Sequence, residues 1–240
     1  MLNRENIKRL ASQHETSEIN IAREYVQHLF LSLFYREKYS RQILFKGGTA
    51  LRIVFQSPRF SEDLDFLGFD IKFTTLERLL LNVMDGISRA GLSIDISDSK
   101  KTSEGYIGVL ELEFAGFRPR ILLEVSLRKK DNPGGEPVMI AGDFLPPYML
   151  ETLPREEIVD EKLAATLTRA KARDYFDTYF LLRKGLVSVS QRKALVGIKR
   201  ALESRKTSFE EELGVFLPAG QKQIIRNLKK VLMQEISRYV

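Results

Sequence analysis

A change of hydrophobic pattern near residue 131 divides this chain of 240 residues into two parts. Before that point, segments with the periodicity of amphipathic helices alternate with short apolar runs typical of strands. From residue 155 onward the pattern is helical. The segment between them, Asp131–Gly135, combines turn-forming residues, a proline and paired glycines, which is a strong loop signal. We therefore expect an α+β chain, with a mixed-sheet unit at residues 1–135 and an all-helical unit at residues 136–240.

The expected elements follow from periodicity and from the turn residues between them. Strands are expected over residues 42–46, 63–69, 92–97, 106–114 and 120–127. Helices are expected over residues 19–39, 49–54, 74–90, 156–171, 174–184, 190–204 and 221–239. Thr49 is expected to cap the short helix that follows the first strand.

Composition excludes several classes of active site. The chain has no cysteine, which removes disulfide frameworks, thiolate zinc sites, iron–sulfur clusters and cysteine nucleophiles. Its only histidines are His14 and His28, so neither a multi-histidine zinc site nor a Ser-His-Asp hydrolase is expected. A metal bound here would be held by oxygen ligands, which points to magnesium, manganese or calcium.

The positive charge is concentrated near the C-terminus. Residues 183–240 contain 13 Lys and Arg against 5 Asp and Glu, while the whole chain contains 38 against 32. This distribution favours a phosphate-rich partner bound by the C-terminal helices, although solvated helix surfaces explain it equally well. The N-terminus is polar, and no segment approaches the roughly 20 apolar residues of a membrane span, so we expect a cytoplasmic protein without a membrane partner.

Two aspartates in one expected strand form the first candidate site. Asp63 and Asp65 are two residues apart, so both side chains should point to the same face. Neighbouring carboxylates repel and raise each other's pKa, and a divalent cation bound by both removes the repulsion. Glu124 is the preferred third ligand, because an unpaired charge within an apolar run is unfavourable. Glu111 and Glu113 remain alternatives, and a solvated strand edge is the competing interpretation of the aspartates.

A glycine turn precedes these aspartates. Lys46-Gly47-Gly48-Thr49 lies between an expected strand and an expected helix. Paired glycines let the backbone approach a phosphate, and the free amides of a helix start favour anions. By itself the segment could be only a tight turn. Together with the aspartates it predicts a site where amides hold the phosphates of a nucleotide and metal ions bridge them.

A charged stretch at residues 161–177 is the third candidate. If this stretch were one continuous helix, Lys162, Arg169 and Arg173 would lie within about 40° of arc. Such a stripe could bind triphosphate oxygens or a nucleic-acid backbone. Asp174 could pair with Lys162 or Arg173, or accept a proton. The alternative is an ordinary exposed helix face with salt bridges.

Taken together, these segments resemble the AbiEii/AbiGii family of nucleotidyltransferase toxins. The matching motifs, in the expected order, are FKGGTALR at 45–52, RFSEDLDF at 59–66, EKL at 161–163 and RDYFD at 173–177. The likeness covers residues 40–183. It implies a polymerase-β-like nucleotidyltransferase core followed by helices, in which the glycine turn and the Asp-x-Asp strand form the nucleotide and metal site.

The resemblance also implies roles for individual residues. Asp63 and Asp65, with Glu124, would hold Mg²⁺ or Mn²⁺ on a nucleoside triphosphate. Lys162 would neutralise the leaving phosphates, and Asp174 would position Lys162, Arg173 or the incoming hydroxyl. The residues expected to contact the nucleotide are Lys46, Gly47, Gly48, Thr49, Arg59, Ser61, Arg169 and Arg173.

The expected reaction is transfer of a nucleoside monophosphate from a nucleoside triphosphate to RNA, at the 3′ end of tRNA. The resemblance implies a toxin of a toxin–antitoxin or phage-defence system, with a cognate antitoxin as partner. Two alternatives stay open: a protein or small-molecule acceptor, and a non-catalytic nucleic-acid-binding module. The C-terminal charge favours RNA, and two carboxylates beside a nucleic acid disfavour a simple binding module.

Overall fold

The computed structural model describes residues 2–128, 133–205 and 208–240. The chain divides into two compact units, here called unit 1 (Met1–Gln56 and Phe60–Leu153) and unit 2 (Ser57–Arg59 and Pro154–Val240). The sequence predicts a border at residue 135, whereas two strands that follow this residue pair within unit 1. The first two residues of the loop expected at 131–135 lie outside the described residues.

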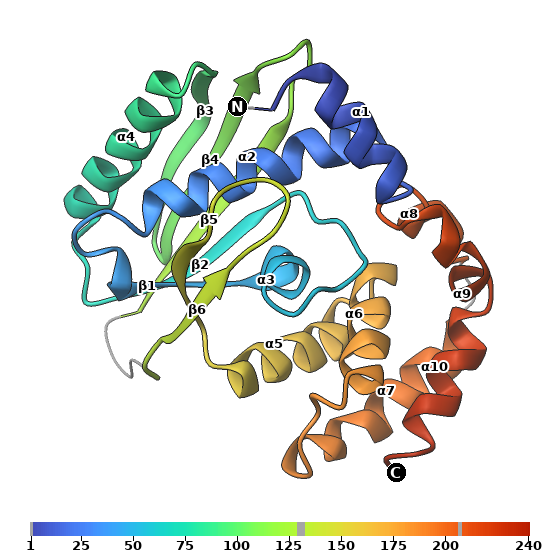
Figure 1. Cartoon of the computed structure of the whole chain (residues 1–240). Coiled ribbons are helices and arrows are strands. Elements are labelled where there is room, and N and C mark those ends of the chain that lie inside the picture. Colours follow the sequence, from blue (N-terminus) through green and yellow to red (C-terminus); the bar gives the residue numbers. More distant parts are fainter. Residues whose placement is uncertain (1, 129–132, 206–207) are drawn as a thin grey trace. The chain divides into compact units, whose positions relative to one another are not determined.

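The strands of unit 1 form one mixed sheet (Figure 1). In the described residues the sheet has seven strands in the order β3-β4-β5-β2-β1-β7-β6. Their bounds are β1 Ile43–Lys46, β2 Leu64–Phe69, β3 Ser93–Thr102, β4 Gly105–Glu113, β5 Arg120–Arg128, β6 Glu136–Ile140 and β7 Tyr148–Thr152. The pairs β2–β5 and β1–β7 are parallel, and the others are antiparallel. The predicted α+β class is confirmed.

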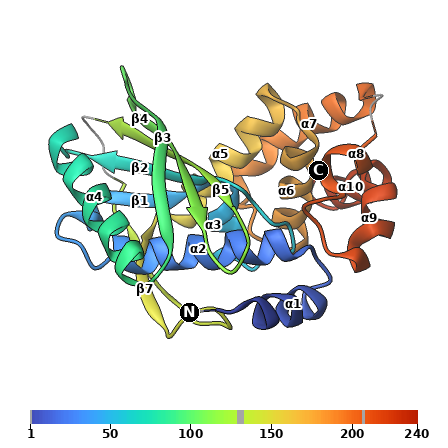
Figure 2. The same ribbon diagram turned by 90° about the horizontal axis from the view of Figure 1, so that it is seen from above.

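Helices of unit 1 cover one face of this sheet (Figures 1 and 2). Their bounds are α1 Arg4–Gln13, α2 Glu18–Phe34, α3 Gly47–Ile53 and α4 Phe73–Arg89. The helix α2 contacts β5, β7 and α4, while α4 contacts β3. Side chains of Asn3 and Ser17 accept hydrogen bonds from backbone amides of the first turns of α1 and α2, so both starts are capped.

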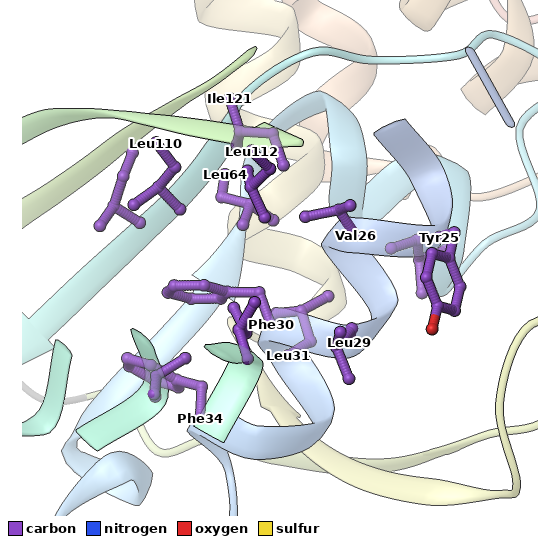
Figure 3. Close-up of a cluster of buried hydrophobic side chains, with 14 of the residues drawn as sticks. Tyr25, Val26, Leu29, Phe30, Leu31, Phe34, Leu64, Leu110, Leu112 and Ile121 are labelled. Atoms are coloured by element: carbon purple, nitrogen blue, oxygen red, sulfur yellow. The ribbon is translucent and has the colours of Figure 1, made fainter. Parts of the chain in front are cut away.

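The core of unit 1 lies between α2, α4 and the sheet. Its strand residues alternate with exposed ones, as in β5, where Ile121, Leu123 and Val125 are buried and Leu122 and Glu124 are exposed. Figure 3 shows the part of this cluster where α2 meets the strands; the labelled side chains are Tyr25, Val26, Leu29, Phe30, Leu31, Phe34, Leu64, Leu110, Leu112 and Ile121. This packing leaves the opposite sheet face for polar side chains such as Glu124.

The described residues of unit 2 from Pro154 onward contain helices and no named strand, whereas the first part of the helical unit predicted at residues 136–240 forms strands β6 and β7. Its helices are α5 Arg155–Thr168, α6 Ala172–Arg183, α7 Lys193–Ser204, α8 Glu210–Leu213, α9 Lys222–Arg226 and α10 Leu228–Ile236. The expected helix at 221–239 is split at Asn227, and the stretch 161–177 is not one helix, because it breaks at residues 169–171. In the described parts of the chain, no helix is both long and apolar enough to cross a membrane.

His28 of α2 is buried in unit 1. Its Nδ1 atom lies 2.9 Å from the Tyr148 hydroxyl, and its ring stacks on Phe144. Burial, together with the positive charge of Arg52, lowers the pKa of His28 to about 4. The folded protein therefore favours the neutral ring at pH values where the unfolded chain binds a proton.

This burial predicts that the stability of unit 1 falls as the pH is lowered from 6.5 to 4. In that window the unfolded state binds more protons than the folded state, which lowers the unfolding free energy by up to roughly 3 kcal/mol. We expect His28→Gln to flatten this dependence in urea denaturation followed by circular dichroism. An unchanged slope in His28→Gln would contradict the assignment.

Candidate active site

Strand register aligns three predicted site residues on unit 1. Lys46 of β1 is the partner of Asp65 on β2, and Asp65 is the partner of Glu124 on β5. Partners on neighbouring strands point to the same face with their Cβ atoms about 5 Å apart. The side chain of Asp65 is partly buried and that of Glu124 is exposed. The structure thus brings Asp65 and Glu124 together, as the sequence predicts, whereas Glu111 lies on β4, which is not adjacent to β2.

The segment before β2 is anchored residue by residue. Strand β2 begins at Leu64, so Asp63 precedes the strand rather than lying in it. Four consecutive residues are each held by a side chain of α2 or α3: the Arg52 guanidinium lies over the Phe60 ring, Gln27 donates to the Ser61 carbonyl, Arg23 pairs with Glu62, and Thr49 donates to the Asp63 carbonyl. This anchoring gives the motif RFSED a structural role and fixes the approach to Asp65.

The glycine turn contacts the carboxylate directly. Gly47 has a φ of +84°, and a Cβ atom at this position would lie 1.9 Å from Oδ2 of Asp65. Only glycine fits both the backbone angle and the space. The helix α3 starts at Gly47 with Lys46 as its N-cap and no side-chain cap. The prediction that Thr49 caps this helix is therefore wrong, because its buried hydroxyl bonds to the Asp63 carbonyl instead.

In unit 2 a buried carboxylate holds two of the predicted cations. Asp177 accepts two hydrogen bonds from the Arg59 guanidinium, at 2.8 and 3.0 Å, and one from Nζ of Lys162 at 2.8 Å. All three side chains are at least nine-tenths buried. Burial raises the pKa of Asp177, but the charges of Arg59 and Lys162 and their hydrogen bonds outweigh it and lower the pKa to about 2.

Asp174 is buried at the start of α6. It pairs with Arg169 at 2.8 Å, and its carboxylate accepts the backbone amide of Lys171, closing a capping box at the start of α6. Ala170 has a φ of +49°, which ends α5 before this cap. Arg169 and Arg173 therefore do not share a helix with Lys162, and the continuous cationic stripe expected at 161–177 is not present.

Asp177 is a candidate site residue to which the sequence analysis gave no role, although it ends the motif RDYFD. It is buried and lies three residues after Asp174, so both acids face the same side of α6. The sequence signal for Asp177 was its position in an expected helix directly after Tyr175 and Phe176, which are core residues. Such an acid requires a cationic partner, although its identity depends on the tertiary contacts.

The donor chemistry of unit 1 fits a hard divalent cation, because the site offers carboxylate oxygens. The described residues nevertheless contain no group of three or more His, Cys, Asp or Glu side chains placed to hold a metal ion. The three-carboxylate cluster expected from Asp63, Asp65 and Glu124 is thus not preformed. A magnesium ion commonly uses only one or two carboxylates and takes its other ligands from phosphates and water, which this arrangement allows.

The chain is similar to known nucleotidyltransferase toxins in sequence pattern and in fold. A family model described as "Nucleotidyl transferase AbiEii toxin, Type IV TA system" matches residues 29–237. A search of curated protein sequences gave no match. The structure of JHP933 from Helicobacter pylori is similar, with a TM-score of 0.70, 20% identity, and 93% of each chain covered. MenT4, a nucleotidyltransferase toxin from Mycobacterium tuberculosis, has a TM-score of 0.70 at 17% identity, covering 99% of this chain and 89% of that one. These two likenesses show a shared fold.

The glycine turn predicts a sharp difference between two glycine substitutions. We expect Gly47→Ala to lower the unfolding free energy by more than about 1 kcal/mol, because alanine is strained at positive φ and collides with Asp65. Gly142→Ala is the matched control, since a Cβ there meets nothing within 4 Å. Denaturation of both variants measures the difference, and equal stabilities would contradict the close contact.

The ion triad predicts that unit 2 depends on Asp177. Asp177→Asn leaves two buried cations without a carboxylate and should lower the unfolding free energy by about 3–5 kcal/mol at pH 7. Because the folded pKa lies below the unfolded value of 3.8, the contribution persists at higher pH and is lost as the pH falls toward 2.

The control for this prediction is Asp85→Asn, which removes an exposed ion pair with Arg89 on α4. Exposed pairs contribute little, so this variant should unfold like the unmodified protein. Chemical denaturation followed by circular dichroism distinguishes the two variants. Equal effects would mean that the triad does not stabilise unit 2.

Proposed function

The chain belongs to the AbiEii family of nucleotidyltransferase toxins, which the family model assigns to type IV toxin–antitoxin systems. From this family membership we propose that the protein transfers a nucleoside monophosphate to RNA. The donor is a nucleoside triphosphate, and the acceptor is the 3′ end of tRNA. The observation that carries the proposal is the alignment of Lys46, Asp65 and Glu124 beside the Gly47 turn. A cognate antitoxin is the expected partner.

Unit 1 supplies the residues for the donor phosphates. The backbone at Gly47 and Gly48 has no side chain to keep a phosphate away, and Lys46 adds a positive charge on the same face as Asp65. Asp65 and Glu124, with Asp63, would hold Mg²⁺ or Mn²⁺. Such an ion stabilises the charge that develops on the phosphates during transfer. Thr49 and Ser61 support this site through the anchoring of the turn and of the segment before β2.

Unit 2 supplies a positioned ammonium group. Lys162 has three N–H donors, and Asp177 accepts one of them in the structure. The triad of Arg59, Lys162 and Asp177 carries a net charge of +1 when ionised, which favours an anion such as a triphosphate near Lys162. Arg59 thus acts through Asp177 in this proposal rather than by contacting the nucleotide, and the positioning role predicted for Asp174 passes to Asp177. Arg169 and Arg173 remain proposed phosphate contacts.

The reaction is an in-line displacement at the α-phosphorus. A hydroxyl oxygen of the RNA forms the new bond to phosphorus, the bond to pyrophosphate breaks, and the hydroxyl proton passes to water. Asp65 and Glu124 lie on the sheet face where both reactants would meet. Pyrophosphate leaves with the negative charge that Lys162 would neutralise.

RNA as the acceptor is supported by the surface of unit 2. Exposed basic residues lie on its helices α7, α9 and α10 and just after α10, namely Lys193, Arg200, Lys222, Arg226, Lys229, Lys230 and Arg238. Phosphate groups of a nucleic acid are the partners that such a surface attracts. A protein or small-molecule acceptor would not need this number of exposed cations.

The proposed function predicts that Asp65→Asn and Glu124→Gln each reduce nucleotide transfer by about a hundredfold or more, since each removes a ligand of an ion that contributes several kcal/mol. The measurement is transfer of label from an α-labelled nucleoside triphosphate to total RNA. Glu111→Gln is the control, because Glu111 is an exposed carboxylate of β4 paired with Arg120. Full activity in either site variant with a native circular dichroism spectrum would contradict the proposal.

The acceptor is tested by the same assay on separate fractions. Labelled nucleotides incubated with total RNA, with lysate protein and with small metabolites should give product in the RNA fraction alone. Label in the protein fraction would replace RNA by a protein acceptor. Growth arrest on expression, relieved by Asp65→Asn, would show that the transfer is toxic.

A further inference from the structure

The sheet face that carries Asp65 and Glu124 continues across the hairpin of β3 and β4. Glu124 is the register partner of Ile107 on β4, and Ile107 is the partner of Lys100 on β3. A single row therefore crosses five neighbouring strands, from Lys46 through Asp65, Glu124 and Ile107 to Lys100. It has a lysine at each end and two carboxylates near its centre. Figure 2 shows β3, β4 and β5 side by side.

A small polar pocket opens beside Glu124 on this row. Its volume is about 230 Å³, and it lies between the turn of the β3–β4 hairpin and β5. Hydroxyl and carboxylate side chains dominate its lining, which consists of Thr102, Ser103, Glu104, Tyr106, Ile107, Glu124, Val125 and Ser126. Ligand pockets for whole small molecules measure roughly 300–1,000 Å³, so this pocket suits one sugar or one terminal residue of a larger molecule.

The hairpin turn is fixed against β5. The amide of Leu127 donates to the Glu104 carbonyl at 2.6 Å. Gly105 has a φ of +156°, and a Cβ atom there would lie 1.9 Å from the Val125 carbonyl. The wall of the pocket that carries Ser103 and Glu104 is therefore built into the sheet.

The side chains of the pocket favour the binding of hydroxyl groups over the binding of phosphates. The carboxylates of Glu104 and Glu124 accept hydrogen bonds from hydroxyls and repel a phosphate placed between them. Lys100, which is exposed and two strands away from Glu124, is the nearest cation in the row on this side. A ligand with free hydroxyls inside the pocket and a phosphate outside it would match both the carboxylates of the pocket and the positive charge of Lys100.

We propose that this pocket binds the 3′-terminal ribose of an RNA acceptor, with the adjacent phosphate on Lys100. The inference rests on the proposed function and assigns the two ends of the row to two substrates. The donor phosphates bind at the Lys46 end, beside the glycine turn, and the acceptor binds at the Lys100 end. Asp65 and Glu124 then lie between the reacting groups.

The first test compares two adjacent lysines. Lys100 shares a face with Ile107, whereas Lys101 is the partner of Tyr106 and its Nζ lies 4.8 Å from the Phe73 ring on the opposite face. Binding of a short 5′-fluorescent single-stranded RNA is measured by anisotropy at several salt concentrations. Lys100→Gln should reduce the slope of log affinity against log salt by about 0.7, the value for one phosphate contact, and Lys101→Gln should not. Equal slopes in the two variants would overturn the proposal.

The second test uses the terminal group of the same RNA. An RNA with a free 3′-terminal ribose should bind at least about fivefold more tightly than its 3′-phosphorylated form, because the phosphate meets two carboxylates. Glu104→Gln should narrow this difference, and Glu111→Gln, which changes a carboxylate outside the pocket, should not. No discrimination by the unmodified protein would overturn the proposal.

Both tests measure binding, so their outcome is separate from that of the transfer assay. End discrimination without label transfer would contradict the proposed function and leave the pocket assignment standing. Label transfer to RNA with no effect of Lys100→Gln or Glu104→Gln on RNA binding would leave the function standing and overturn the pocket.

Discussion

The contact between the Asp65 carboxylate and the backbone of Gly47 is the constraint on which the unit 1 site depends. It follows from the antiparallel register of β1 and β2, which places the start of α3 directly against the Asp65 side chain. No side chain other than hydrogen fits between them. The same register sets Lys46 opposite Asp65, and the parallel pairing of β2 with β5 then adds Glu124. Strand pairing therefore determines which charges meet.

In unit 2 the constraint is electrostatic rather than steric, because three buried charged groups must pair with one another. Removing the charges of Arg59, Lys162 and Asp177 from water is unfavourable. The arrangement is stable because the Arg59 guanidinium donates to both oxygens of the Asp177 carboxylate, and the Lys162 ammonium also donates to one of them, Oδ2. The interaction fixes a long, flexible lysine in one position. A positioned ammonium is what a phosphate site needs, because little conformational entropy is then lost when an anion binds.

Local patterns predicted most elements but not their ends. The strand at 63–69 and the helix at 74–90 are found within one residue, since alternation and amphipathic spacing are visible in the sequence itself. The helix α1 and the strands β6 and β7 were missed. Prolines at 137, 146 and 147 read as loop signals, yet β6 is an edge strand, where a missing amide donor is tolerated. The helix break at Ala170 could not be predicted, because no glycine or proline lies at this position.

The sequence by itself determined the class of the fold, the family motifs and the alternation that leaves Asp65 only partly buried between the buried Leu64 and Phe66. Each of these is encoded within a few neighbouring residues. Only the tertiary structure decided that Lys162 pairs with Asp177 and that Glu124, not Glu111, stands beside Asp65. Those pairings depend on which helices pack together and which strands are neighbours, and such contacts join residues far apart in the chain.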